Sequence, residues 1–276
     1  MSDQPTGLVI ADDHLATLER LEPTPQSFAV SSDEMAKLPR EWHSDIPARN
    51  QGHFSCCVGG GLSGCFEHSN QLETGEFIRR SMWMAYIASQ RACGMLGRDS
   101  GASLSGALKA AGTVGVCRNE LCQMPDSYVT NVSAEAMADA AKHKHMTTTW
   151  DARPWEKAVD WVTNKNPLLI GGLWTDRHSG LNAQDNIEKP SIYSGNRRGH
   201  HCRYACGWIF IDGKLYLKIR NTHGDAFGIH GVSYLPEETW AVLVRDPNFV
   251  ALAFGDTEEI EPVRKSWSES KAGDIA

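Results

Sequence analysis

Several features of other protein classes are missing from this sequence of 276 residues. No apolar run reaches the ~18 residues of a membrane-spanning helix, so we expect no membrane partner. There is no run of basic residues, and 34 acidic against 27 basic side chains give a net charge of −7, which does not favour a nucleic-acid partner. The N-terminus lacks a basic start followed by an apolar stretch, so no signal peptide is expected. There is also no internal repeat.

The missing export signal affects how the eight cysteines are interpreted. An even number of cysteines could form a disulfide framework in a secreted protein. Without such a signal, reduced thiols are expected, in the cytoplasm or another reducing compartment, with association with a virus particle left open. Cys202 and Cys206 lie beside two histidines and could be a metal site. Their spacing is not that of a common zinc motif, so neither a metal nor another cofactor is predicted.

The length allows one large domain or two lobes that share a cleft. Apolar residues recur mainly at helical spacing in the first half and in short strand-like runs in the second half. Ser103 is a candidate N-cap, and Asp212-Gly213 is a hairpin turn signal. The predicted elements are helices at residues 77–88, after Ser103 and at 155–162, and strands at 166–174, 208–211, 214–219, 233–236 and 240–244.

Residues 50–57, Asn-Gln-Gly-His-Phe-Ser-Cys-Cys, contain the strongest candidate for a reactive thiol. A thiol nucleophile needs a base, a group that orients the base, and donors for the oxyanion. Cys57 directly precedes a glycine-rich stretch that is expected to begin a short buried helix. A helix N-terminus lowers the pKa of a thiol from its usual ~8.5. For one cysteine alone, a small buried apolar residue is the ordinary alternative.

A histidine and an asparagine follow in the order that such a thiol requires. His201 lies 144 residues after Cys57 (201 − 57), and Asn221 follows on a later strand. The order and the intervals resemble those of the papain-like cysteine peptidases, in particular their bacterial and phage branch, where ~130–150 residues separate cysteine and histidine. The family interval to Gly207 selects His201 over His200.

The segment before the thiol carries the same resemblance. Gln51 lies six residues before Cys57, in a pattern similar to the Gln-Gly-x-x-x-Ser-Cys of the family, and this interval selects Cys57 over Cys56. The resemblance implies a cysteine peptidase in which Cys57 attacks the peptide carbonyl and His201 holds the proton. It also implies that Asn221 orients the imidazole, and that Gln51 and the Cys57 N–H bind the oxyanion.

A further run, residues 99–117, is similar to the Asp-x-Gly-x-Ser segment of the bacterial branch and to the Tyr-Gly-Val-Cys that follows it. In the family, a glycine at this turn lets the substrate backbone pair as a strand. An ordinary turn glycine that needs a positive φ is an equal alternative for Gly101. The candidate residues for binding a peptide or protein substrate are Gly101, Ser100, His200 and Cys202.

The resemblance implies an α+β, papain-like two-lobe fold. A helical N-terminal lobe and an antiparallel, β-barrel-like C-terminal lobe would enclose the active site in the cleft between them. The expected segments are an N-terminal arm at 1–38, the helical lobe with the nucleophile at 39–127, the β-rich lobe with histidine and asparagine at 128–255, and a polar tail at 256–276. The arm looks too short for an inhibitory pro-segment, so it is expected to pack on the body or to bind an assembly partner.

Two departures from the family leave other functions open. His223 replaces the aromatic residue that shields the His–Asn hydrogen bond, and Arg203 replaces an apolar residue near His201, whose pKa it is expected to lower. One alternative is therefore a catalytically silent papain-like module for binding or structure, for example in a phage particle. Another is thiol-dependent acyl transfer.

Overall fold

The computed structural model describes residues 6–10, 22–23, 35–144 and 147–256. The predicted polar tail beyond Asp256 and most of the predicted arm lie outside these residues. The helices and strands, in chain order, are β1 (Glu22–Pro23), β2 (Glu41–His43), α3 (Cys57–Thr74), α4 (Met82–Ala92), α5 (Leu104–Thr113), the 3₁₀ helix η2 (Asn119–Leu121), α6 (Ala134–Ala140), β3 (Thr147–Asp151), α7 (Trp155–Thr163), β4 (Leu168–Thr175), η3 (Asp176–Gly180), η4 (Pro190–Ser194), β5 (Arg197–Ile211), β6 (Lys214–Arg220), β7 (Val232–Pro236), α8 (Glu237–Leu243) and β8 (Val250–Asp256).

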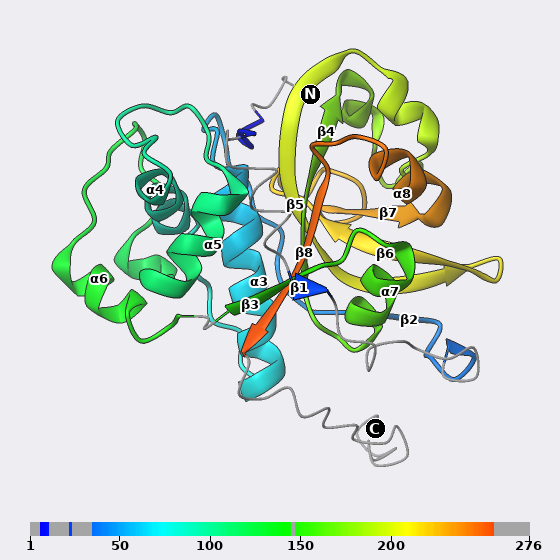
Figure 1. The fold of residues 1–276 in the computed structure, drawn as a ribbon, viewed down its shortest axis with the longest axis horizontal. Coiled ribbons are helices and arrows are strands. Elements are labelled where there is room, and N and C mark those ends of the chain that lie inside the picture. The colour runs from blue at the N-terminus through cyan, green and yellow to red at the C-terminus, as the bar shows by residue number, and fades with distance from the viewer. Residues whose placement is uncertain (1–5, 11–21, 24–34, 145–146, 257–276) are drawn as a thin grey trace.

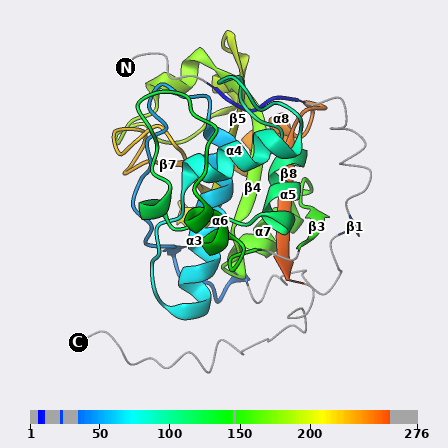
Figure 2. The same cartoon turned by 90° about the vertical axis from the view of Figure 1, so that its left-hand side faces the viewer.

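Helix α3 runs through the middle of the molecule, with α4, α5 and α6 on one side and the sheet on the other (Figure 1). Figure 2 shows the same four helices from their own side, in front of the sheet. Because neighbouring residues of a strand point to opposite faces, the sheet contributes to two apolar cores. One core lies between the sheet and α3, α4 and α5. The second lies between the opposite face and helices α7 and α8. Within the described residues, no helix is long and apolar enough to span a membrane.

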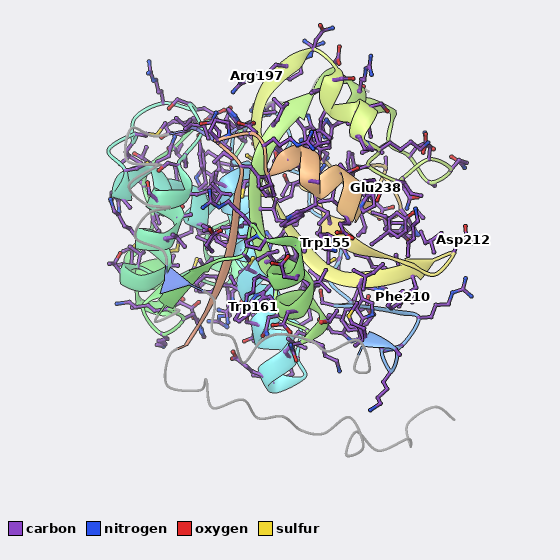
Figure 3. The ribbon with its side chains drawn as sticks, turned by 45° about the vertical axis from the view of Figure 1, so that its right-hand side comes forward. Trp155, Trp161, Arg197, Phe210, Asp212 and Glu238 are labelled. Carbon is purple, nitrogen blue, oxygen red and sulfur yellow. The ribbon has the colours of Figure 1, made fainter. Side chains whose placement is uncertain are left out.

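The strands follow the order β1-β3-β8-β4-β5-β6-β7, and β2 pairs with β5. All pairs are antiparallel except β1 with β3. Strand β5, with 15 residues, extends from Arg197 at one rim to the turn at Asp212 (Figure 3). Asp212 and Gly213 both have a positive φ, 50° and 77°, as a two-residue hairpin requires, and the predicted hairpin is confirmed.

The helix that follows the candidate nucleophile has 18 residues and is longer than the short helix expected. Two of its glycines lie where no side chain fits. A Cβ on Gly60 would lie 2.2 Å from Cγ2 of Thr222, and a Cβ on Gly61 would lie 2.8 Å from Sγ of Cys202. Glycine is costly inside a helix, by ~1 kcal/mol relative to alanine. Here it lets α3 lie directly against the part of the chain that carries the candidate histidine and asparagine.

Some predicted helices and strands differ from the observed ones in where they begin or in their type. Helix α4 begins at Met82, five residues later than predicted, because the Ser81 hydroxyl caps it by accepting a hydrogen bond from the Met84 N–H at 2.9 Å. The predicted cap at Ser103 is confirmed by its bond from the Gly106 N–H at 3.1 Å. The strand predicted at residues 240–244 is wrong. This stretch belongs to helix α8, which starts directly after strand β7 ends at Pro236.

Arg203 of strand β5 and Glu188 form an ion pair in the protein interior. The guanidinium of Arg203 donates to the Glu188 carboxylate, and both side chains are almost completely buried. The hydroxyls of Tyr193 and Ser233 also donate to this carboxylate. Burial alone raises the pKa of Glu188, but Arg203 and the other donors outweigh it and hold the pKa below its usual value.

We expect Glu188→Gln to lower the free energy of unfolding by about 3–5 kcal/mol, because the charge of Arg203 would stay buried without its carboxylate. Urea denaturation at pH 7 measures this loss. Since the folded-state pKa of Glu188 is lowered, its contribution is complete above the unfolded value of ~4.3 and is lost as the pH falls through the folded value.

The control is Asp185→Asn, which breaks the exposed ion pair with Lys189 and should cost less than about 1 kcal/mol. Equal losses in the two variants would contradict the prediction.

Candidate active site

Cys57 is the first residue of α3 and is completely buried. Its Sγ accepts hydrogen bonds from two backbone N–H groups, that of Cys202 at 3.4 Å and that of Gly7 at 3.2 Å. The thiol of the preceding residue, Cys56, faces the Gln51 carbonyl instead, at 3.9 Å. The structure therefore places Cys57, and not Cys56, against the strand that carries the candidate histidine.

His201 is held by Asn221 in a defined protonation pattern. Its Nε2 lies 2.7 Å from Oδ1 of Asn221, and the same oxygen accepts the Thr222 backbone N–H at 2.7 Å. Because this oxygen is an acceptor, Nε2 of His201 must be the donor, which leaves Nδ1 as the acceptor of the neutral ring. Among the described residues, Nδ1 has no hydrogen-bond partner. It is thus available to take a proton.

Two rings enclose the His201 imidazole. Trp174, near the end of β4, lies 4.5 Å from it between ring centroids, and His223 lies 4.6 Å from it. Trp174 is only 6% exposed and also contacts His223 and Phe227. The sequence interpretation noted His223 at the shielding position but missed Trp174. The only signal was that Trp174 ends the apolar run predicted to be the strand before the histidine loop.

The amide of Gln51 connects the nucleophile segment to the asparagine segment. Its Oε1 accepts the Thr222 hydroxyl at 2.6 Å, and its Nε2 donates to the Phe54 carbonyl at 2.8 Å. The Gln51 backbone N–H also donates to the Thr222 carbonyl, at 2.8 Å. The role of Gln51 as an oxyanion donor stays a prediction.

Asp99 fixes the loop that leads into the nucleophile. Its carboxylate accepts the Ser55 backbone N–H at 3.0 and 3.1 Å and the Tyr86 hydroxyl at 2.7 Å. The Tyr86 oxygen in turn accepts the Gly101 N–H at 3.1 Å. The segment two residues before Cys57 is thereby tied to the turn at residues 99–101. The sequence identified this run but not its role as a positioning element.

The chain's own residues 6–10 lie across the thiol. Gly7 donates its N–H to Cys57, and Leu8 donates to the His200 carbonyl at 3.2 Å. The segment also pairs in parallel with Ala102, which accepts the Val9 N–H at 2.9 Å and donates to the Gly7 carbonyl at 2.8 Å. Although the arm is short, five of its residues are enough to cover the candidate nucleophile.

The four predicted substrate-binding residues take different positions around this segment. His200 contributes its carbonyl, and Cys202 contributes an N–H directed at the thiol. Gly101 has a φ of 84°, and a Cβ on it would lie 2.3 Å from the Gly7 carbonyl oxygen, so it provides close approach while Ala102 does the pairing. Ser100 bonds through its N–H to Arg98 and not to the segment.

Burial controls the charge state of the covered site. It raises the pKa of the Cys57 thiol to about 11, although the N–H groups of Cys202 and Gly7 oppose the shift. Burial also lowers the pKa of His201 well below its usual value, and the nearby His223 lowers it further. Arg203 acts in the same direction, as expected, but more weakly. The thiol and the imidazole are therefore both neutral while residues 6–10 are in place.

The imidazole of His223 is also uncharged near neutral pH. Burial, and then the positive charge of Arg203, lower its pKa to about 4. His223 therefore acts near pH 7 as a neutral ring that packs against His201 at 4.6 Å.

Comparison with known proteins identifies the fold. No protein-family model and no curated protein sequence matches the chain. Solved structures do match. Xylellain, a cysteine protease from Xylella fastidiosa, superimposes with a TM-score of 0.72 over 92% of this chain and 96% of its own, at 16% identity. ProCathepsin B S9 from Trypanosoma congolense gives 0.61 over 90% and 85%, at 14% identity. The procathepsin L2 proteinase from Tenebrio molitor larval midgut gives 0.62 over 91% and 78%, at 14% identity.

The chain has the papain-like fold. The predicted α+β class, with helices on one side and an antiparallel sheet on the other, is confirmed. In this papain-like fold, Cys57 lies on α3 and His201 lies on β5, with Asn221 directly after β6. The four predicted segment boundaries stay predictions.

The cysteines and histidines of this papain-like chain do not form a metal site in the residues that the structure describes, where no group of three or more potential ligands is arranged to hold an ion. Cys202 and Cys206 both point into the core between the sheet and α3. All eight cysteines are unpaired in the structure, and the reduced state stays a prediction.

Proposed function

We propose that this chain is a papain-like cysteine peptidase whose active site is covered by its own residues 6–10. One observation carries the proposal. The hydrogen bond from Nε2 of His201 to Asn221 leaves Nδ1 of His201 as a proton acceptor. The next residue of β5, Cys202, donates its N–H to the Cys57 thiol. A thiol at a helix start, a base and a group that orients this base are the parts that thiol catalysis needs.

The chemistry starts when the covering segment leaves. The Cys57 thiol gives its proton to Nδ1 of His201, and the thiolate attacks the carbonyl carbon of the scissile peptide bond. The oxyanion is stabilised by the Cys57 N–H and the Gln51 amide. The imidazolium then protonates the leaving amine. In the second step His201 takes a proton from water, and hydroxide releases the acyl group as a carboxylic acid. Asn221 keeps the imidazole in the productive orientation.

The covering segment also indicates which substrates fit. Leu8 is 6% exposed and lies in the same apolar cluster as Leu104, next to Gly171 of β4. A Cβ on Gly171 would lie 2.7 Å from Cδ2 of Leu8 and 2.6 Å from Cδ1 of Leu104. Since there is no room for more atoms, the pocket around Leu8 would accept a leucine-sized apolar side chain of a peptide and disfavour a charged one.

The proposal is tested by peptide hydrolysis with Leu8→Asp, a variant meant to displace the segment. We expect it to cleave fluorogenic peptides, with leucine favoured over glutamate in the residues before the cleaved bond, and we expect Leu8→Asp with Cys57→Ala to be inactive. Absence of cleavage in Leu8→Asp, with the Cys57 thiol shown by alkylation to be accessible, would contradict the proposal.

The pocket has its own test in the same Leu8→Asp background. Gly171→Ala should reduce the preference for leucine over alanine peptides by about tenfold, because one methylene-sized difference in an apolar pocket is worth ~1–3 kcal/mol. In this background the added methyl meets only the end of the Leu104 side chain, because residue 8 is no longer leucine. Gly172→Ala is the matched control. Its methyl lies on the opposite face of β4, against Phe249, and should leave the preference unchanged. Equal effects of the two substitutions on the preference for leucine would contradict the assignment of the pocket.

A further inference from the structure

Six of the eight thiols are buried, and only Cys93 and Cys122 are partly exposed. Of these two, Cys122 packs against the small cluster that contains a second thiol, that of Cys117. Cys117 is fully buried in this cluster together with Met84. An accessible thiol and a shielded thiol are thus in contact, far along the chain from Cys57.

The local fold keeps the two residues together. The chain turns back on itself through η2 (Asn119–Leu121), and the Cys122 N–H closes the turn on the Asn119 carbonyl at 3.2 Å. Both cysteines are then tied to Ser81. Its backbone N–H donates to the Cys117 carbonyl at 2.9 Å, and its hydroxyl donates to the Cys122 carbonyl. Ser81 is the N-cap of α4, so the thiol pair lies at the N-terminus of an 11-residue helix.

The contact also makes the two thiols chemically unequal. The interaction with the Cys117 thiol lowers the pKa of Cys122 to about 7 against the opposing effect of burial. The same interaction, with burial, raises the pKa of Cys117. A thiolate that is partly exposed reacts first, and a neighbouring thiol can then displace what it has bound.

We propose that Cys122 and Cys117 form a reversible dithiol–disulfide site that reacts with low-molecular-weight disulfides. The Cys122 thiolate attacks one sulfur of the disulfide, so a mixed disulfide forms and one small thiolate leaves. Cys117 loses its proton to solvent and attacks Sγ of Cys122, which forms the Cys117–Cys122 bond and releases the second small thiolate. Two protein thiols are oxidised by two electrons, and one small disulfide is reduced to two thiols.

The site adjoins the proposed active-site segment. Gln123 and Met124, directly after Cys122, line a surface depression together with Asn50, the neighbour of Gln51. A disulfide between Cys117 and Cys122 would therefore change the conformation of the segment that borders this depression. The inference itself does not depend on peptidase activity, because its readout is the state of the two cysteines.

The experiment incubates the full chain at pH 7 in buffers of reduced and oxidised glutathione, quenches with acid and maps every cysteine by mass spectrometry. We expect a Cys117–Cys122 disulfide to become the main oxidised species and to be reversed by dithiothreitol. Cys93, whose thiol faces the Gln90 carbonyl at 3.6 Å, is the internal comparison and should be modified more slowly. A chain in which Cys122 remains reduced, or in which Cys93 is modified at the same rate, would overturn the proposal.

Two substitutions separate the roles of the thiols. Cys117→Ser should accumulate glutathione on Cys122, because no thiol is left to displace it, and Cys122→Ser should leave Cys117 unmodified. Cys117→Ala should also slow alkylation of Cys122 at pH 7 by about threefold, since a return from a pKa near 7 to ~8.5 removes most of the thiolate but raises its nucleophilicity. Unchanged alkylation in Cys117→Ala, or an intramolecular bond in Cys117→Ser, would contradict the assignment.

Discussion

Replacing Leu8 with aspartate is expected to raise the rate at which iodoacetamide alkylates Cys57 at pH 7 by at least about tenfold. In the covered site, burial raises the pKa of this thiol to about 11, so almost no thiolate exists at neutral pH. A carboxylate in the apolar pocket of Leu8 would cost several kcal/mol, which exceeds what a few backbone hydrogen bonds contribute. Residues 6–10 should therefore leave the cleft and expose the thiol to solvent and to Nδ1 of His201.

Peptide mass spectrometry of the alkylated protein, across a pH series, measures the effect. The midpoint for Cys57 should fall below 7 in Leu8→Asp if a thiolate–imidazolium pair forms once the segment is displaced. Leu8→Met, which keeps an apolar side chain of similar volume, is the matched control and should behave like the unchanged chain. If both variants react as slowly as the unchanged chain, residues 6–10 do not control access to Cys57.

The second large effect is expected at the base. In the Leu8→Asp background, His201→Ala should lower the rate of peptide hydrolysis by at least about 10²–10⁴-fold, because no other group would take the thiol proton and return it to the leaving amine. Asn221→Ala should cause a smaller loss. The ring would keep its chemistry but lose the 2.7 Å hydrogen bond that selects the Nε2–H tautomer.

Steady-state kinetics with a leucine-containing peptide measures both losses, and circular dichroism verifies that each variant is folded. Equal activity of His201→Ala and its parent would exclude His201 as the base. If the exposed thiol is alkylated at low pH but no peptide is cleaved, the chain is instead a binding or structural module of papain-like fold. Incorporation of amines into peptides without hydrolysis would indicate acyl transfer.

The catalytic candidates could be found from the sequence because their spacing reflects a fold in which each residue has a fixed place. Cys57 begins α3, His201 lies within β5 and Asn221 directly follows β6, and hydrogen bonds bring these three segments together at the start of α3. The turn at Asp212-Gly213 and the cap at Ser103 could also be predicted from the sequence, because a few neighbouring residues determine the backbone conformation there.

Some local patterns gave the wrong secondary structure, because contacts with residues far along the chain determine whether a helix or a strand forms there. Residues 240–244 are apolar and β-branched enough for a strand, yet α8 forms because Trp240 and Leu243 pack on the second core. The glycines after Val58 make a poor helix by propensity, yet α3 continues for 18 residues because close contacts with Thr222 and Cys202 surround it.

By itself, the sequence determined the order and the spacing of the candidate nucleophile, base and orienting group, the α+β class and the acidic net charge of the chain. Only the tertiary structure decided the environment of these groups. Residues 6–10 cover Cys57, Trp174 and His223 enclose His201, and Cys117 meets Cys122. The physical reason is that hydrogen bonding and burial depend on which residues lie in contact, and intervals along the chain do not carry that information.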